Sequence, residues 1–265
     1  MARSTKEKGS GGVKSAERTL ELLEYFAARV GSAQSLTEIS RALGIPKSSA
    51  FGLVKTLERR GYVHEEGTKY VLGHRLFTLG MAYLNHNDLV EKAQATIQDL
   101  NMRSGETIHL AQLDGAEVLY LSIKESSHPF RIVSQVGMRI PAHVTAVGKA
   151  LLAERSTAEI LSLYEDAGFV AFTPSSITSR GALVDELERI RAQGYSFDDE
   201  ESNLGVQCVA AVIRDATGTA VAAISITSPT VRMDRERFLK LIRSGADEVS
   251  RRLGFMGSSP VASIR

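Results

Sequence analysis

Apolar residues in the first part of the chain recur at helical spacing. A first amphipathic helix is predicted over about 14–29, with apolar positions at Ala16, Leu20, Leu23, Ala27 and Val30. Ser35 stands three residues before Glu38, which is the spacing of a capping box and predicts the start of a short second helix. Gly44 fits the end of that helix, and Pro46 suits the first turn of a third helix.

Two strand signals follow the third predicted helix. Residues 62–63 and 69–72 flank the turn residues Glu66-Gly67, which predicts a β-hairpin. Two short helices joined by a glycine-containing turn are typical of a helix-turn-helix, and an adjoining hairpin makes it a winged one. The second helix of such a pair enters the DNA major groove with its N-terminal residues at base edges. The predicted DNA-binding residues are Lys47, Ser48, Ser49, Phe51, Lys55 and Lys69. A module that binds protein, as an interaction adaptor, is the alternative.

An apolar stripe over 76–84 predicts a helix that connects this module to the rest of the chain. This stripe and the first predicted helix cannot both be fully buried in so small a module. One use for the stripe is contact with a second copy of the chain, since operators with two half-sites require two modules. The alternative is a helix that only caps its own domain.

The remaining residues alternate strand and helix signals. Strands are predicted at 107–113, 117–123, 130–136, 206–213 and 219–227, the first two joined at Asp114-Gly115. Helices are predicted at 89–100, 146–153, 156–164, 183–190 and 238–253. Strands joined by hairpins, with helices between them, predict an α+β domain in which helices pack against an antiparallel sheet.

Charge is distributed unevenly between these segments. The 265 residues carry 32 Lys and Arg against 31 Asp and Glu, a formal net charge of +1. Residues 1–75 hold 13 basic and 8 acidic side chains, whereas residues 76–265 hold 19 and 23. A basic segment joined to an acidic one is typical of a polyanion-binding module attached to another domain. Residues 1–12 are basic and rich in Gly and Ser, which predicts a flexible arm.

Composition excludes several classes of protein. The single cysteine, Cys208, excludes an intramolecular disulfide framework and fits a reducing compartment. No apolar run approaches the roughly 18 residues of a membrane span, and the first 15 residues lack the apolar core of a secretory signal. No metal-ligand spacing or glycine-rich phosphate loop is present, so no metal or cofactor is expected. A thiol nucleophile at Cys208, with His109 or His143, leaves an enzyme as an alternative function.

Long motifs in the second domain resemble the IclR family of bacterial transcriptional regulators. They are IPAHVTAVGKALLA at 140–153, GYSFDDEE at 194–201 and GVQCVAAVI at 205–213. The winged module, with IPKSS at 45–49 and LERRGYV at 57–63, is similar to the DNA-binding domain of that family. The resemblance extends over about 13–255.

The resemblance implies a domain organisation and a function. A winged helix-turn-helix domain is expected over 13–75, a linker helix and GAF-like effector-binding domain over 76–258, and a tail over 259–265. The protein is expected to form dimers or tetramers in the cytoplasm and to bind double-stranded operator DNA as a repressor or activator. Its operator binding would be controlled by a small molecule, usually a carboxylate or aromatic metabolite.

The expected effector site follows from the chemistry of a carboxylate, which needs hydrogen-bond donors. The N-terminus of the helix at 146–153 offers free backbone N–H groups and a favourable dipole. The residues predicted there are Thr145, Ala146, Val147 and Gly148, the last for close approach of the ligand. By resemblance the opposite wall is Asp198, Cys208, Ser225 and Thr227, and Met138 and Ile140 supply an apolar wall. An inert buried thiol and a solvated acidic run at 198–201 are the plain alternatives.

The chain departs from the family pattern in its third predicted helix. Family members often carry His-Arg where this chain has Phe51-Gly52, and that arginine would normally help to grip DNA. Glycine inside a helix also costs about 1 kcal/mol relative to alanine. The departure calls the family's DNA specificity into question for this chain.

Overall fold

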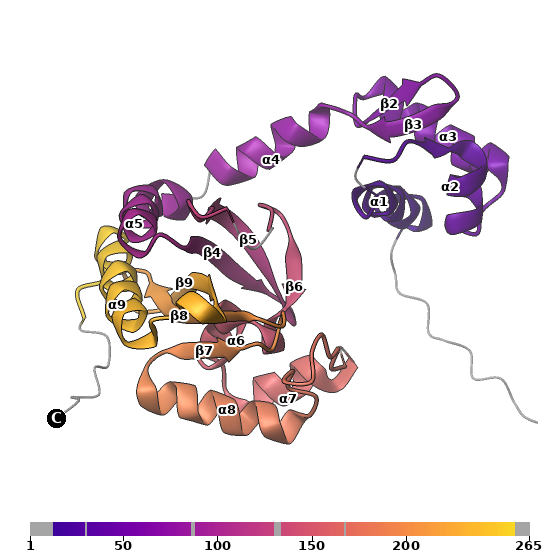
Figure 1. Ribbon diagram of the computed structural model, residues 1–265. Coiled ribbons are helices and arrows are strands. Elements are labelled where there is room, and N and C mark those ends of the chain that lie inside the picture. Colours follow the sequence, from indigo (N-terminus) through magenta and orange to yellow (C-terminus); the bar gives the residue numbers. More distant parts are fainter. Residues whose placement is uncertain (1–12, 30, 86–87, 130–133, 167, 258–265) are drawn as a thin grey trace, which may run out of the picture. The chain divides into compact units, whose positions relative to one another are not determined.

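The computed structural model describes residues 13–29, 31–85, 88–129, 134–166 and 168–257. The chain divides into two compact units, Met1–His86 and Asn87–Arg265, each with its own core (Figure 1). The division follows α4 (Arg75–Asn85), the helix that the sequence analysis grouped with the second domain. The predicted arm at 1–12 and tail at 259–265 lie outside the described residues.

The first unit contains the predicted helix-turn-helix and wing. Its elements before α4 are α1 (Lys14–Ala27), β1 (Gln34–Ser35), α2 (Leu36–Ala42), α3 (Lys47–Arg59), β2 (Val63–Glu66) and β3 (Lys69–Leu72). β2 and β3 form the predicted hairpin. The short strand β1 was not predicted, and it pairs with β3 to make a three-stranded sheet in the order β1-β3-β2.

Local sequence signals fix the ends of α2 and α3. Ser35 Oγ accepts the N–H of Glu38 at 3.3 Å, and the Glu38 carboxylate accepts the N–H of Ser35 at 2.7 Å, so the capping box is present. Gly44 follows α2 with a φ of +60°, a value that favours glycine, and Pro46 precedes α3. The core that these elements enclose consists of Leu22, Phe26, Ile39, Ile45, Ala50, Val54, Leu57, Val63 and Tyr70.

The buried face of α1 differs from the predicted one. Leu22 and Phe26 are the buried residues of this helix, whereas Leu20 is 60% exposed. The helix carries apolar side chains on more than one face, and the face with the aromatic ring of Phe26 enters the core. Apolar side chains of α4 are also exposed, by 73% at Phe77 and 52% at Tyr83.

The second unit is an antiparallel sheet covered by helices, as predicted. Its elements are α5 (Asp88–Ser104), β4 (Thr107–Asp114), β5 (Glu117–Lys124), β6 (Arg139–Pro141), α6 (Ala146–Leu152), α7 (Thr157–Asp166), α8 (Arg180–Gln193), β7 (Ser196–Asp199), β8 (Val206–Arg214), β9 (Ala220–Pro229) and α9 (Arg235–Arg252). The strand order is β6-β5-β4-β9-β8-β7, and every neighbouring pair is antiparallel.

Helices cover both faces of this sheet. α5 and α9 lie side by side on one face, and α6 lies on the other, with α7 and α8 behind it (Figure 1). Successive side chains of a strand point to opposite faces. Ile108 and Leu110 of β4 therefore pack under α5 and α9, whereas Ala111 packs on the α6 side.

The two edge strands are where the strand prediction was wrong. Residues 134–136 are not a strand, and residues 130–133 lie outside the described residues. The edge strand is instead β6, just after this segment, and it pairs with β5. β7 was not predicted, because a four-residue strand that contains Asp198 and Asp199 lacks the apolar alternation of a typical strand.

Candidate functional site

The first candidate site is the exposed face of α3. Four of the six predicted DNA-binding residues are exposed on the first five positions of this helix: Lys47, Ser48, Ser49 and Phe51. Ala50, Val54 and Leu57 hold the opposite face in the core. Lys69 is also exposed, at the start of β3 in the wing. The structure thus presents two ammonium groups and two hydroxyls to solvent from the helix and the wing.

Lys55 has partners of its own within this unit. Its Nζ lies 2.8 Å from a carboxylate oxygen of Glu58 on α3 and 2.5 Å from one of Glu65 on β2. Hydrogen bonds to Glu58 and Glu65 raise the pKa of Lys55 above its ordinary value. This ammonium therefore joins α3 to the wing, and it would contact a phosphate only by giving up those carboxylates.

Gly52 leaves an open position on the same face of α3. A Cβ atom placed there meets nothing within 4 Å, and the helix continues through it without a positive φ. Packing therefore does not require glycine at this position. A larger residue can therefore start from this position without a clash at its Cβ atom.

The second candidate site is a cavity of about 350 Å³ in the second unit. It lies on the α6 side of the sheet, where strand register brings polar side chains together. His109 of β4 is opposite Ser225 of β9, and Cys208 of β8 is opposite both Thr227 of β9 and Asp198 of β7. The volume falls in the range of about 300–1,000 Å³ that is common for small-molecule sites.

Nine of the ten predicted effector-binding residues line this cavity: Met138, Ile140, Thr145, Ala146, Val147, Asp198, Cys208, Ser225 and Thr227. Seven lining residues were not predicted as part of the site: His109, Tyr120, Ser134, Ser202, Asn203, Leu204 and Val206. His109 and Tyr120 belong to β4 and β5. They could be assigned to the same face as Ser225 only once the strand order was known.

Gly148 is the predicted residue that does not line the cavity. Its N–H donates to Thr145 Oγ1 at 3.1 Å, so the helix cap already uses this donor. A Cβ at Gly148 would lie 2.2 Å from the carbonyl oxygen of Ala142. The glycine is therefore needed for close packing of α6 against the preceding turn, and not for the approach of a ligand. Ala146 and Val147 are the first helical residues, whose N–H groups have no partner within the helix.

A chain of hydrogen bonds crosses the floor of the cavity. Thr227 Oγ1 donates to Cys208 Sγ at 3.1 Å and lies 3.2 Å from His109 Nδ1. His109 Nε2 lies 2.8 Å from Ser134 Oγ. A Thr227 hydroxyl that donates to sulfur goes with the His109 tautomer in which Nδ1 donates to Thr227 and Nε2 accepts from Ser134.

Burial keeps this floor uncharged. Desolvation lowers the pKa of His109 to about 4, and the ring stacks on Tyr120 with centroids 4.7 Å apart. Desolvation, reinforced by the nearby charge of Asp198, raises the pKa of the Cys208 thiol well above its ordinary value. A thiol is a poor nucleophile without its thiolate form. The Thr227 hydroxyl also stands between Cys208 and His109, and His143 packs elsewhere, against Tyr164.

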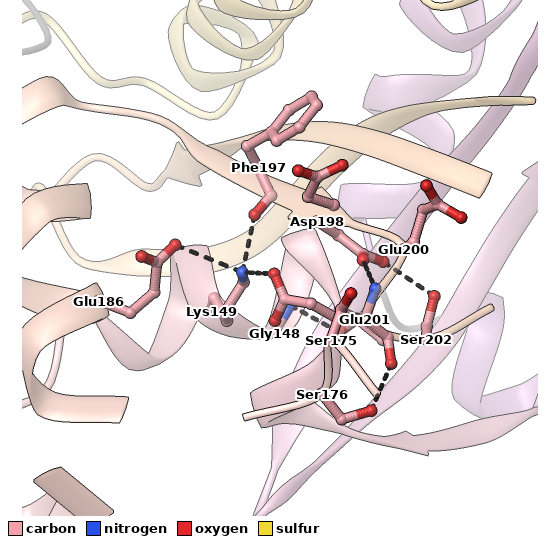
Figure 2. Close-up of polar contacts among 12 residues, drawn as sticks. Gly148, Lys149, Ser175, Ser176, Glu186, Phe197, Asp198, Glu200, Glu201 and Ser202 are labelled. Atoms are coloured by element: carbon pink, nitrogen blue, oxygen red, sulfur yellow. Dashed lines mark hydrogen bonds and ion pairs between the residues drawn. The ribbon is translucent and has the colours of Figure 1, made fainter. Parts of the chain in front are cut away.

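Asp198 is the charged group of the cavity wall. Its carboxylate accepts the N–H of Glu201 at 2.7 Å and the hydroxyl of Ser202 at 2.8 Å (Figure 2). Desolvation raises its pKa above the ordinary value, opposed by the hydrogen bond from Ser202 and by the positive charge of Lys149. The acidic run at 198–201 is therefore not simply solvated, because Asp198 and Glu201 are both buried.

The described part of the chain shows two further general features. No group of three or more His, Cys, Asp or Glu residues within it is arranged to hold a metal ion. None of its helices combines the length and the apolar character needed to cross a membrane.

Both halves of the chain match known protein families. Residues 15–67 match the IclR helix-turn-helix domain, and residues 81–251 match the C-terminal domain of bacterial transcriptional regulators of the IclR type. The regulator XynR of Escherichia coli is 35% identical over 248 residues, which are 92% of this chain and 98% of that protein. The repressor AllR of Salmonella typhi is 34% identical over 256 residues, or 95% and 93% of the two chains.

Solved structures have the same fold. The IclR protein of Thermotoga maritima superimposes with a TM-score of 0.72 at 30% identity, covering 91% of this chain and 99% of that one. An IclR homologue of Microbacterium hydrocarbonoxydans, solved with 4-hydroxybenzoate, gives a TM-score of 0.80 at 24% identity and covers 91% and 99%.

We expect His109 to remain neutral from pH 8 down to about pH 5, because burial holds the pKa of the folded protein's imidazole near 4. The unfolded chain binds this proton near pH 6.5, so the free energy of unfolding should fall as the pH drops from 6.5 to 4. The loss should approach about 3 kcal/mol. NMR titration of the ring, assigned with His109→Gln, measures the pKa. Comparing the unfolding of the two proteins from pH 7 to 4 measures the loss. A midpoint at 6.5 or above would contradict the expectation.

Proposed function

The chain belongs to the IclR family of bacterial transcriptional regulators, and we propose that an organic acid bound in the cavity of its second unit controls how it binds an operator. DNA binding itself follows from the family and from the winged helix-turn-helix of the first unit. The observation that carries the effector proposal is the cavity, where nine predicted residues meet on the α6 side of the sheet. We further propose that the protein acts in the cytoplasm, where bacterial DNA lies.

An organic acid suits the chemistry of the cavity wall. At neutral pH the floor carries a neutral imidazole and a neutral thiol, so an anion there faces no fixed negative charge from Cys208. The Ser225 hydroxyl and the first N–H groups of α6 are donors for a carboxylate. Met138 and Ile140 provide apolar surface for the remainder of the ligand. Benzoate and 4-hydroxybenzoate, the latter being the ligand of the Microbacterium homologue, are the first probes to try.

We propose that the protein binds DNA as a dimer or a larger symmetric assembly. α4 has no buried residue among those described, yet Phe77, Leu79 and Tyr83 are apolar or aromatic and at least half exposed. A helix whose apolar side chains are exposed is typical of an interaction surface. Contact with α4 of a second copy would bury these side chains. The second copy also brings the second recognition helix, α3, that an operator with two half-sites requires.

The mechanism proposed is allosteric. An effector can change DNA affinity only by binding one arrangement of the paired first units more tightly than another. Coupling of about 1–3 kcal/mol, or 5- to 150-fold in operator affinity, is usual for such a system. The sign of the change decides whether the effector releases the operator or promotes its occupancy.

Gly52→Arg is expected to alter DNA binding. A Cβ atom at this exposed position of α3 meets no neighbour, and one added cation should raise affinity for DNA of any sequence. The plot of log affinity against log salt should steepen by about 0.9. Gly52→Ala is the control, because it improves helix propensity by about 1 kcal/mol without adding charge. Fluorescence anisotropy on operator and randomised DNA measures both. Unchanged binding to both DNAs by Gly52→Arg would refute this prediction.

Cys208→Ala combined with Ser225→Ala should weaken effector binding. The two substitutions remove the thiol and a donor from the cavity wall while leaving the strand pairing, and we expect at least a tenfold loss, about 1.4 kcal/mol. Isothermal titration with benzoate and 4-hydroxybenzoate measures the affinity. Ser244→Ala, on the exposed side of α9, is the matched control. A folded double variant that binds as tightly as the parent would show that the ligand binds elsewhere.

Phe77→Glu should weaken self-association. A charge on an exposed apolar face costs little in the isolated chain but is costly to bury in a dimer. Sedimentation velocity at several protein concentrations should show a shift towards the monomer, with the unfolding temperature of each unit preserved. Met102→Glu, on α5, introduces the same charge at another exposed apolar position and should leave the assembly unchanged. Equal association of both variants and the parent would exclude α4 as the interface.

A further inference from the structure

Lys149 is fully buried and lies outside the set of residues that line the cavity. It follows Gly148 on α6, all of whose residues are buried, and its own exposed fraction is 0%. A buried ammonium is stable only when it is paired and fully hydrogen-bonded. Its three N–H bonds therefore require three acceptors, and they find them outside the cavity.

The three acceptors come from three different elements. Nζ donates to the Glu201 carboxylate, to the carbonyl oxygen of Phe197 at 2.7 Å, and to the Glu186 carboxylate on α8 at 3.3 Å (Figure 2). Phe197 belongs to β7, and Glu201 belongs to the turn at residues 200–205 that joins β7 to β8. The lysine thus connects α6 to β7, to this turn and to α8.

The 200–205 turn forms one wall of the cavity. Three of its residues, Ser202, Asn203 and Leu204, line the cavity, while Thr145, Ala146 and Val147 line it from the start of α6. Lys149 does not line the cavity. It holds the two walls together from behind, through Glu201.

The backbone of this turn is held in an unusual conformation. Glu200 has a φ of +61°, and it is the only residue other than glycine with a positive φ in the described part of the chain. Such a conformation costs of order 1–3 kcal/mol for a side chain of this size, so surrounding contacts must maintain it.

Hydroxyl groups hold the turn from the loop before α8. Thr173 Oγ1 donates to the carbonyl oxygen of Glu200 at 2.6 Å, and Ser176 Oγ donates to that of Glu201 at 2.7 Å. These bonds fix the backbone but leave the charge of Glu201 uncompensated. One Glu201 oxygen, Oε2, is buried without a hydrogen-bond partner among the described residues, so the carboxylate depends on Lys149.

We propose that Lys149 is a positioning residue for the effector cavity, which holds the 200–205 turn against α6 through Glu201 and so keeps the two walls at the separation that binds ligand. The proposal rests on the proposed function, because it takes this cavity as the effector site. Without the ammonium, Glu201 and Asp198 are two buried carboxylates on one short segment. Opening of the turn would expose Glu201 to water and so remove the cost of burying its unpaired charge.

Hydrogen–deuterium exchange of the unliganded, full-length protein tests the turn directly. In Lys149→Met, amides of residues 199–206 should exchange at least about tenfold faster than in the parent, with amides of α9 unchanged. Glu186→Gln removes the negative charge of another acceptor of the same ammonium, one that is not in the turn, and it should leave exchange at 199–206 unchanged. Lys240→Met breaks an exposed lysine–glutamate pair on α9 and is the matched control.

A double variant separates positioning from simple packing. Lys149→Met with Glu201→Gln removes both charges of the pair, so the turn no longer needs to hydrate a carboxylate. Exchange at 199–206 should return towards the parent rate, and affinity for benzoate or 4-hydroxybenzoate should recover from a loss of about tenfold or more in Lys149→Met. If Lys149 only fills space, the double variant will be no better than the single one, and that result would overturn the proposal.

The two proposals fail in different ways. If the parent binds neither acid, the effector class is wrong, whereas the exchange measurement on the unliganded protein still decides whether Lys149 holds the turn. If the acids bind and exchange at 199–206 is unchanged in Lys149→Met, the role of Lys149 is wrong and the effector site stands. Should Lys149→Met fail to fold, Glu201→Leu gives a second test, since it removes both oxygens through which Lys149 holds the turn. Faster exchange at 199–206 supports the proposal, and parent-like exchange refutes it.

Discussion

The second unit depends on one constraint: both faces of its sheet are covered by helices, so side chains on either face of the central strands are buried. Alternation along β4, β8 and β9 then sorts them onto two faces. The α5/α9 face is mainly apolar, with Ile108, Val209 and Ile224 among its buried residues. Polar residues of these strands gather on the α6 face, where each must find a hydrogen bond or a solvated cavity, since a buried polar group without either is costly. The chain from Ser134 through His109 and Thr227 to Cys208 meets that requirement, and the cavity lies above it.

Asp198 places a carboxylate in the cavity that is proposed to hold an acidic ligand. Its carboxylate is occupied by the Glu201 N–H and the Ser202 hydroxyl. The positive charge of Lys149 also acts on it from behind the cavity wall. Its charge is therefore partly compensated inside the protein, and the donors that remain for a ligand come from α6 and β9. A carboxylate can occupy the same cavity as Asp198 because the two are served by different donors.

Sequence reasoning succeeded where the signal is local. The capping box of Ser35 and Glu38, the hairpin around Gly67 and the start of the helix at 146 all have the predicted form, because each depends on residues within a few positions. It failed where the answer depends on tertiary contacts. Which face of α1 is buried, that β6 and β7 form the edges of the sheet, and that Lys149 reaches Glu201 all depend on packing partners distant in sequence.

The site prediction divides in the same way. The helix N-terminus, apolar character and the family resemblance together located nine residues of the cavity, but not His109 or Tyr120, whose place on the α6 face follows from strand order. Gly148 shows the opposite error. A glycine beside a helix N-terminus suggests close approach of a ligand, yet the close neighbour is the carbonyl of Ala142. A glycine in the sequence can indicate a close neighbour, but the folded structure is needed to identify that neighbour.

The two units have separate cores, so an effector bound in the second unit has to influence DNA binding by the first without a shared core. The core of the first unit runs from Leu22 to Tyr70, and the buried clusters of the second begin at Leu89. The segment between them includes α4, with no buried residue among those described. In the proposed mechanism, an effector acts on how the first units are paired, not on whether they fold. A symmetric dimer has two cavities that act on one equilibrium between arrangements of the paired first units. If the effector binds one arrangement modestly more tightly at each cavity, the two contributions add to a larger change in DNA affinity. The proposed pairing through α4 would combine two weak preferences into one regulatory response.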